Sequence, residues 1–247
     1  MMMSAKIAQM TDHMDDRQRD VFRIVVREYL RSAEPVGSAL IVSRHRLGVS
    51  PATIRNDMVE LDDRGILEQP HTSAGRIPTD AGYRYYVEQF VQKSELEESR
   101  RNELEAAVVE LERDMESAGR AFAKKVAAIT GETAVIRIGT QTYLTGVANM
   151  MGKPEFREGD LVRSTMQVID DLDALLGDVE RRAGESVTVL IGADNPFGRA
   201  LSSVVTVCAV PELGEAVIGI LGPTRMDYDT NVALMRYIHD RLEDFDI

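Results

Sequence analysis

The sequence of 247 residues has one cysteine, Cys208, and lacks any long apolar run. A single cysteine cannot form an internal disulfide, and its position inside the apolar run 204–210 is typical of a buried strand residue rather than a nucleophile. The first ten residues include Lys6 and show neither a signal-peptide nor a membrane-span pattern. We therefore expect a cytoplasmic protein.

Common catalytic signatures are also missing. The sequence contains no glycine-rich phosphate loop, no paired metal ligands and no serine in a strained strand-to-helix turn. Its four histidines, His13, His45, His71 and His239, are scattered. Each is more typical of a surface or phosphate-facing residue than of a catalytic base. We expect no enzyme, no cofactor and no metal site.

The sequence has 29 Lys and Arg but 41 Asp and Glu, which gives a formal net charge of −12. That balance is unusual for a nucleic-acid binder, but it is unevenly distributed. Residues 1–93 hold 13 Lys and Arg and 13 Asp and Glu, whereas residues 94–247 hold the other 16 and 28. A neutral first part can still bind DNA. The acidic second part would suppress non-specific binding, or it would only aid solubility.

The segment Ser-Pro-Ala-Thr-Ile-Arg-Asn-Asp-Met, residues 50–58, predicts a helix whose first turns have a polar face. Ser50 is a good N-cap, and Pro51 suits the first helical position. The residues expected on the core face are Ile54, Met58 and Leu61. Those on the opposite face, which suit base edges and phosphates, are Ala52, Thr53, Arg55 and Asn56.

A shorter helix over 38–46 and a turn containing Gly48 precede this segment, and a hairpin follows it. The predicted hairpin has strands 66–69 and 76–78 around the polar loop 70–75. With helices expected over 14–33 and 79–91, these elements form the winged helix-turn-helix pattern of DNA-binding domains over residues 1–92. Two ordinary packed helices and a solvated turn would explain the same spacing.

Residues 94–129 predict one long linking helix within a segment 93–130, opened by Ser94 and Glu97 as a capping box. Its apolar residues repeat as a heptad seam, which either pairs with a second copy or lies on the next domain. We favour a dimer contact, because two-fold symmetry matches an inverted-repeat DNA site. The predicted dimerisation residues are Leu104, Val108, Leu111, Met115 and Phe122.

After Gly131 the pattern changes to strands, expected over 133–138, 142–147, 186–191, 204–210 and 216–221. Helices are expected over 160–182 and 229–245. This mixture predicts an α+β, GAF-like regulatory domain over 131–247. Its loop 222–228 offers Thr224, Arg225 and Asp227 either as a regulatory, ligand-lining site or as a salt-bridged turn that holds the last helix.

Several runs resemble the heat-inducible transcription repressor HrcA family. In the first part they are 34–38 (Glu-Pro-Val-Gly-Ser), 50–58, 67–79 (Leu-Glu-Gln-Pro-His-Thr-Ser-Ala-Gly-Arg-Ile-Pro-Thr) and 82–87. In the second part they are 149–151, 154–156, 191–192 and 222–228 (Gly-Pro-Thr-Arg-Met-Asp-Tyr). DeoR-type repressors share a Thr-Ile-Arg recognition helix but not this wing.

The resemblance implies a dimeric repressor that binds an inverted-repeat operator upstream of chaperone genes and leaves it on heat stress. It also implies that chaperonin helps the repressor to reach its DNA-binding state. The residues assigned to double-stranded DNA, on base edges, phosphates or the minor groove, are Arg46, Ser50, Thr53, Arg55, Asn56, His71, Thr72, Ser73, Arg76 and Arg84.

One departure concerns association. Familiar members carry a long segment between the strand resembling 133–138 and the one before Asn149, and here almost nothing lies between them. This shortened chain would therefore associate differently, for example through the heptad helix. A ligand-responsive, DeoR-like regulator that senses a metabolite is the alternative function, and a protein-interaction module that no longer touches DNA is a third.

Overall fold

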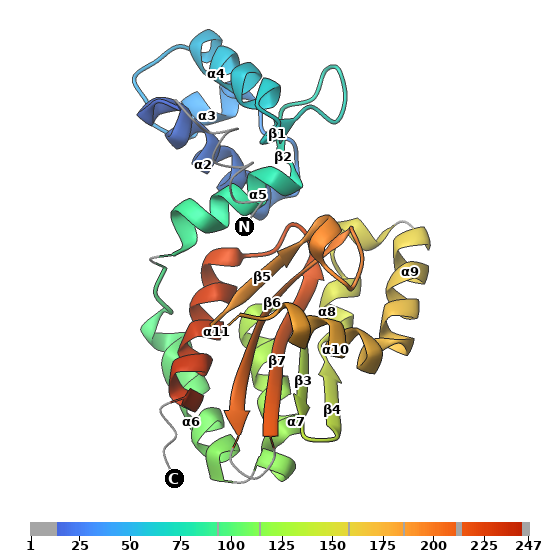
Figure 1. Ribbon diagram of the computed structural model, residues 1–247. Coiled ribbons are helices and arrows are strands. Elements are labelled where there is room, and N and C mark those ends of the chain that lie inside the picture. The colour runs from blue at the N-terminus through green and yellow to red at the C-terminus, as the bar shows by residue number, and fades with distance from the viewer. Residues whose placement is uncertain are drawn as a thin grey trace. The chain divides into compact units, whose positions relative to one another are not determined.

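The computed structural model describes residues 14–92, 94–113, 115–157, 159–184, 186–210 and 214–243 (Figure 1). The chain forms two compact units, Met1–Gln92 and Lys93–Ile247. Each unit has a buried apolar core of its own. Within the described residues, no helix has the length and apolar character needed to span a bilayer.

Helices and a short hairpin make up the first unit, as the sequence predicts. The elements are α2 (Asp16–Ser32), α3 (Ser38–Arg44), α4 (Pro51–Asp63), β1 (Leu67–Glu68), β2 (Ile77–Pro78), α5 (Asp80–Tyr86) and the π-helical turn η1 (Val87–Val91). The predicted start of α2 is stabilised by a capping box. The Gln18 amide donates to Asp15 Oδ1 at 2.7 Å, and the Asp15 amide donates to Gln18 Oε1 at 3.3 Å.

The core of the first unit forms around the apolar face of α2. Its buried residues there are Val21, Phe22, Val25 and Val26. The ring centroid of Phe22 lies 5.3 Å from that of Tyr85 and 6.3 Å from that of Phe90. Two aromatic residues of the segment 79–91 therefore pack on the first helix. Packing of this kind fixes α5 and η1 on α2.

A five-stranded antiparallel sheet forms the centre of the second unit, with strand order β4-β3-β7-β6-β5. The strands are β3 (Thr133–Ile138), β4 (Gln141–Thr145), β5 (Thr188–Ile191), β6 (Leu201–Val210) and β7 (Gly214–Pro223). Successive side chains of a strand point to opposite faces. Val205 of β6 therefore joins an apolar cluster with α10 (Leu172–Arg182), whereas Thr206 and Cys208 face α11 (Tyr228–Glu243).

Helices cover both faces of this sheet (Figure 1). On one face lie α7 (Met115–Thr130) and α11, and α6 (Glu98–Arg113) contacts both of them. On the other face lie α8 (Val147–Met151), α9 (Gly159–Asp170) and α10, with the 3-10 turns η2 (Pro154–Arg157) and η3 (Gly192–Asp194). The predicted α+β architecture is confirmed.

The prediction of one helix over 94–129 is wrong, because α6 and α7 fold back on each other. Nζ of Lys125 lies 3.7 Å from a carboxylate oxygen of Glu103. In a single straight helix the same two residues would be about 33 Å apart. The predicted cap is also wrong: α6 begins at Glu98, and the Ser94 hydroxyl donates to Asp229 Oδ1 at 2.9 Å.

This helical hairpin encloses the heptad seam within one chain. Its buried residues are Leu104, Val108, Leu111, Ala118 and Phe122, and the Met115 side chain lies outside the described residues. Side chains that are already enclosed offer no surface to a second copy. The seam therefore packs on its own domain, which corrects the dimer contact predicted for Leu104, Val108, Leu111 and Phe122.

Other boundaries differ by less. The helix predicted over 160–182 breaks at Asp171, between α9 and α10, and the strand predicted over 142–147 ends at Thr145. Gly146 then takes a left-handed φ of +82°, and a Cβ there would lie 2.4 Å from the Glu132 carbonyl oxygen. Only glycine makes this turn into α8 without strain. Residues 244–245 of the last predicted helix lie outside the described residues.

Candidate nucleic-acid interface

The start of α4 is built as the sequence predicts. Ser50 Oγ accepts a hydrogen bond from the Thr53 amide at 3.1 Å, and Pro51 occupies the first helical position. The hydroxyls of Ser50 and Thr53 lie 3.0 Å apart. Both side chains therefore stabilise the N-terminal end of α4, and their contact with DNA stays a prediction.

Core and solvent faces of α4 follow the helical period. Ile54, Met58 and Leu61 are buried, which confirms the expected core face. Arg55 and Asn56 are exposed on the first two turns. These are the side-chain types that form bidentate hydrogen bonds with guanine and adenine in the major groove. The exposed Arg55–Asn56 face could therefore read base edges.

Acidic residues further along α4 are paired within the protein. Both oxygens of Asp57, a side chain only 4% exposed, accept from Arg17 of α2, at 2.9 and 3.0 Å. Glu60 accepts from Gln18, and Asp62 lies 2.7 Å from Arg76 Nε. These pairings weaken the repulsion that α4 would otherwise exert on a phosphate backbone.

The turn before α4 is anchored by one buried carboxylate. Glu28 of α2 accepts hydrogen bonds from Arg44 at 2.7 Å and from His45 at 3.1 Å. Burial alone would raise the pKa of Glu28, but these two bonds, with the charge of Arg31, hold it below its usual value. Gly48 then takes a left-handed φ of +70° in the turn between α3 and α4.

The loop 69–76 is an ordered wing. Gln69 Nε2 donates to the carbonyl oxygens of Thr72 at 3.0 Å and Ala74 at 2.8 Å. At its base, Val36 and Arg76 exchange two backbone hydrogen bonds of 2.9 Å each. A Cβ on Gly75 would lie 2.2 Å from the Val36 carbonyl oxygen, so only glycine allows this close approach.

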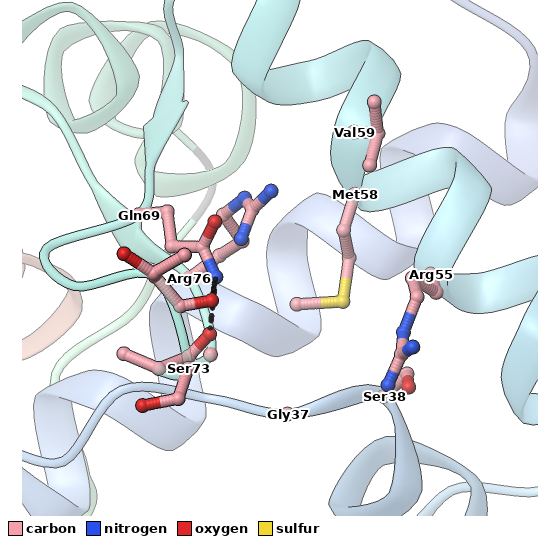
Figure 2. A pocket seen from close by; sticks show the side chains of 11 residues that line it. Gly37, Ser38, Arg55, Met58, Val59, Gln69, Ser73 and Arg76 are labelled. Atoms are coloured by element: carbon pink, nitrogen blue, oxygen red, sulfur yellow. Dashed lines mark hydrogen bonds between the residues drawn. The ribbon is translucent and has the colours of Figure 1, made fainter.

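A groove of about 380 Å³ lies between α4 and the wing. Figure 2 shows Arg55, Met58 and Val59 on its α4 side and Gln69, Ser73 and Arg76 on the wing side. The sequence analysis missed Gln69 and Val59. Val59 is 41% exposed, and its position off the apolar stripe of α4 was the available signal.

Only some of the predicted DNA contacts meet in this groove. Its lining includes Arg55, Thr72, Ser73 and Arg76. The Arg76 side chain is only 14% exposed and pairs with Asp62, so we assign it to holding the wing rather than to contacting phosphate. The predicted contacts that are not among the lining residues are Arg46, Ser50, Thr53, Asn56, His71 and Arg84. Of these, Arg46 and His71 are exposed, and Arg84 is half-buried on α5.

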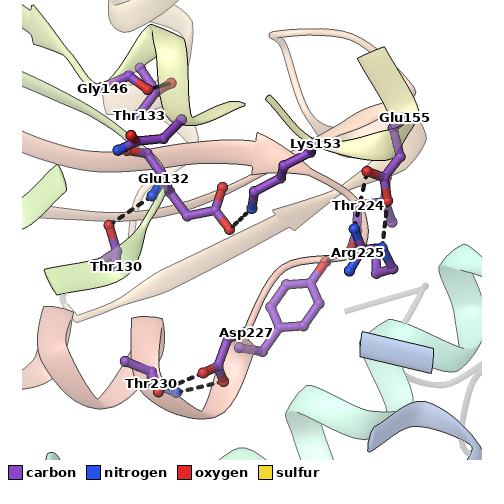
Figure 3. A network of polar contacts seen from close by, with 12 residues as sticks. Thr130, Glu132, Thr133, Gly146, Lys153, Glu155, Thr224, Arg225, Asp227 and Thr230 are labelled. Atoms are coloured by element: carbon purple, nitrogen blue, oxygen red, sulfur yellow. Dashed lines mark hydrogen bonds and ion pairs between the residues drawn. The ribbon is translucent and has the colours of Figure 1, made fainter. Parts of the chain in front are cut away.

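The predicted regulatory loop of the second unit is held by its own contacts (Figure 3). Arg225 donates to both oxygens of Glu155, at 2.5 and 3.1 Å. Asp227 accepts from the Thr230 amide at 3.1 Å and from its hydroxyl at 2.7 Å, at the start of α11. The Thr224 carbonyl accepts from Tyr228 at 2.7 Å. These contacts match the salt-bridged turn, the second of the two expectations.

Cys208 is fully buried on β6. Burial raises the pKa of its thiol to about 11. A thiol that keeps its proton at neutral pH is a poor nucleophile. The side chain therefore behaves as the buried strand residue that the sequence predicts.

Two family models match the chain. One, described as the HrcA protein C terminal domain, matches residues 82–232. The other, described as a DeoR-like helix-turn-helix domain, matches residues 44–79, which hold the turn, α4 and the wing. The first of these models therefore covers more than half of the chain.

Curated relatives carry the name heat-inducible transcription repressor HrcA. The relative from Pelotomaculum thermopropionicum is 28% identical and aligns with 93% of this chain and 96% of its own. The relative from Thermobifida fusca is 51% identical over 92 residues, which are 37% of this chain and 27% of its own. The first alignment spans 334 positions, more than the 247 residues here, so that relative has residues that this chain lacks.

A solved structure shows the same fold. It is a crystal structure of a hypothetical protein, 20% identical, with a TM-score of 0.68 over 94% of this chain and 97% of that one. Fold, family model and curated relatives therefore agree along nearly the whole length. The chain belongs to the HrcA family of heat-inducible transcription repressors.

Proposed function

We propose that this protein binds an inverted-repeat DNA operator upstream of chaperone genes as a dimer, in the cytoplasm, and leaves it on heat stress. The observation that carries the proposal is the exposed Arg55–Asn56 face of α4 beside an ordered wing. The part of the proposal that concerns heat-inducible repression is supported by the names of the curated relatives.

The proposed contacts divide between reading and positioning. Arg55 and Asn56, with Thr53, read base edges in the major groove. Arg46, Ser50 and Arg84 lie along phosphates, and the exposed wing residues His71, Thr72 and Ser73 follow the backbone or the minor groove. Arg76 acts through the wing, because its guanidinium pairs with Asp62.

A metabolite-sensing regulator is the less favoured function. The DeoR-like match ends at residue 79, before the second unit begins, so it bears on DNA binding alone. The HrcA match covers most of the second unit. Regulation through chaperonin, as the family resemblance implies, is therefore the proposal that we carry forward.

The test of DNA reading uses operators selected from a pool of random duplexes. Affinities of the wild-type chain and of Asn56→Ala are measured for the selected duplex and for duplexes with single base-pair changes. We expect Asn56→Ala to lose about 1–3 kcal/mol of discrimination at one base pair in each half-site. Gln89→Ala, an exposed amide on η1, is the matched control.

Results of two kinds would contradict the proposal, the first for the role of Asn56 and the second for the dimer. One is an Asn56→Ala chain that still discriminates fully at every position. The other is a selected duplex without an inverted repeat, or one bound by a single copy of the chain in sedimentation, which would rule out the dimer.

Chaperonin control has a separate readout. We expect purified chaperonin to raise the fraction of chains that can bind the selected operator, and an unfolded client protein to reverse this gain. The active fraction is measured by stoichiometric titration with labelled duplex. An active fraction that chaperonin leaves unchanged at every temperature would remove chaperonin from the mechanism.

A further inference from the structure

Three potential metal ligands meet between the sheet and the last helix of the second unit. They are Cys208 of β6 and His239 and Glu243 of α11. One ligand atom from each lies within 4.8 Å of the other two, and Cys208 Sγ is 3.7 Å from His239 Nδ1. We call these three residues the β6–α11 cluster.

Secondary structure brings this cluster together. Cys208 points from the face of β6 that α11 covers, because it is two residues from Thr206, whose hydroxyl lies 2.8 Å from His239 Nδ1. His239 and Glu243 are four residues apart, so they lie one turn apart on the same side of α11. Cys208 is buried, His239 half-buried and Glu243 exposed, so the cluster extends from the interior of the second unit to its surface.

Sulfur, imidazole nitrogen and carboxylate oxygen are the donors that zinc prefers. Zinc lies about 2.3 Å from sulfur and about 2.0–2.1 Å from nitrogen, so two such ligands on a tetrahedron are about 3.6 Å apart. The sulfur–nitrogen distance of 3.7 Å here fits that geometry. Magnesium and calcium prefer ligand sets of oxygen alone, so the thiol and imidazole argue against them.

We propose that the β6–α11 cluster binds a divalent transition-metal cation, zinc in the first place, which ties α11 to β6. Three protein ligands leave the fourth tetrahedral position to water or to a further ligand. All three residues belong to the second unit and none to the loop 222–228, and the proposal departs from the expectation from sequence that the chain has no metal site.

A hydrogen-bonded cluster without metal is the competing account. The Thr206 hydroxyl, the Cys208 thiol and His239 Nδ1 can satisfy one another, with Thr206 Oγ1 3.9 Å from Cys208 Sγ. That account explains the contacts of Thr206 and His239 without requiring the Glu243 carboxylate, whereas the metal account requires it as a ligand. The two accounts differ in what they predict for Glu243.

The experiment titrates the chelator-treated, full-length chain with cobalt(II), which occupies zinc sites and absorbs when a thiolate binds it. We expect thiolate-to-cobalt charge-transfer absorption that saturates at one ion per chain and disappears when zinc is added. We also expect zinc to raise the melting temperature, because it binds the native state. Absence of the charge-transfer absorption at excess cobalt would overturn the proposal.

Variants identify the ligands. Cys208→Ser should abolish the charge-transfer absorption, and His239→Gln should weaken zinc binding while its amide can still bond to Thr206. Glu243 is exposed, so Glu243→Gln carries little risk to folding. We expect it to weaken zinc binding about tenfold or more, since loss of even an outer-shell partner has such effects.

Asp240→Asn is the matched control, because Asp240 is an exposed carboxylate beside His239 on the same helix and outside the cluster. It should bind zinc as the wild type does. Equal zinc affinities for Glu243→Gln and Asp240→Asn, or charge-transfer absorption that persists in Cys208→Ser, would contradict the proposed ligand set.

Discussion

Glu132 is a buried carboxyl group in the second unit, 2% exposed, at the start of β3. One of its oxygens pairs with Lys153, as Figure 3 shows, and the other faces Gly222, where a Cβ would lie 2.2 Å from it. Burial raises the pKa of Glu132 to about 7, although the charges of Lys153 and Arg225 lower it. The protein therefore holds a carboxyl group that titrates near neutral pH.

This pKa makes stability depend on pH. Between the ordinary value of 4.5 and about 7, the folded state binds more protons than the unfolded state at this group. The free energy of unfolding therefore falls as pH rises through that range, by an amount on the order of 1–3 kcal/mol. Urea midpoints at pH about 5 and about 7.5 measure the fall.

Glu132→Gln should flatten this dependence, because an amide does not titrate. Glu215→Gln, the same change at an exposed position of β7, is the matched control. If the urea midpoints of wild type and Glu132→Gln changed equally with pH, the burial of Glu132 would not be the cause.

Asp62 distinguishes the two roles that Arg76 could have. If Arg76 holds the wing, Asp62→Asn loosens the wing and weakens all duplexes alike, by up to about fivefold for a partly exposed ion pair. If Arg76 instead contacts phosphate, removal of the Asp62 charge would leave the Arg76 guanidinium more available to DNA. Tighter binding of Asp62→Asn with a steeper salt dependence would therefore contradict our assignment.

At the scale of elements, sequence signals that act over a few residues predicted where some helices begin. The capping box of α2 and the Ser50 cap of α4 act within four residues, so the sequence located both helix starts. The break at Asp171 has neither glycine nor proline, and the single position between α6 and α7 is neither of the two. A heptad pattern looks the same whether its partner is another chain or the next helix, so the hairpin was not predictable from it.

The candidate interface divides in the same way. The helix α4 and the wing lie next to each other in the sequence, and the sequence predicts both elements. The pairing of Asp62 with Arg76 and that of Glu28 with Arg44 and His45 join separate elements. Such contacts become visible only in the folded chain, as does the meeting of Cys208 with His239.

The wing can be tested as an element through Gly75→Ala. The added Cβ would meet the Val36 carbonyl oxygen, so the base of the wing must shift, at about 1–3 kcal/mol. We expect faster hydrogen exchange at the Arg76 and Val36 amides and weaker binding to every duplex. Gly37→Ala is the control for exchange, because a Cβ there meets nothing within 4 Å. Unchanged exchange in Gly75→Ala would contradict the close approach.

The α6–α7 hairpin has its own prediction. Leu104→Ala should lower the free energy of unfolding by about 2–5 kcal/mol and leave the association state of the folded chain unchanged, since Leu104 is buried within one chain. Urea denaturation and sedimentation velocity measure the two quantities. Glu103→Ala, in an exposed ion pair with Lys125, should change stability by at most about 1 kcal/mol. A Leu104→Ala chain of normal stability that no longer associates would place the seam between copies.

At the scale of the whole molecule, two properties bear on DNA binding: the distribution of charge and the length of the chain. All of the net charge of −12 comes from residues 94–247, so attraction to phosphates must come from local cations of the first unit. The chain is also shorter than the 334 positions of its alignment with a relative. Binding by this chain would therefore show that the additional residues are not needed to recognise an operator.

The central claim is selective DNA binding by the intact chain. Its most direct test is fluorescence anisotropy of the selected inverted-repeat duplex and of a scrambled duplex across a salt series, with and without chaperonin. We predict tighter binding to the selected duplex, with a logarithmic salt slope of about −0.9 for each neutralised phosphate. Equal affinity for both duplexes, or binding to neither even with chaperonin, would contradict the account.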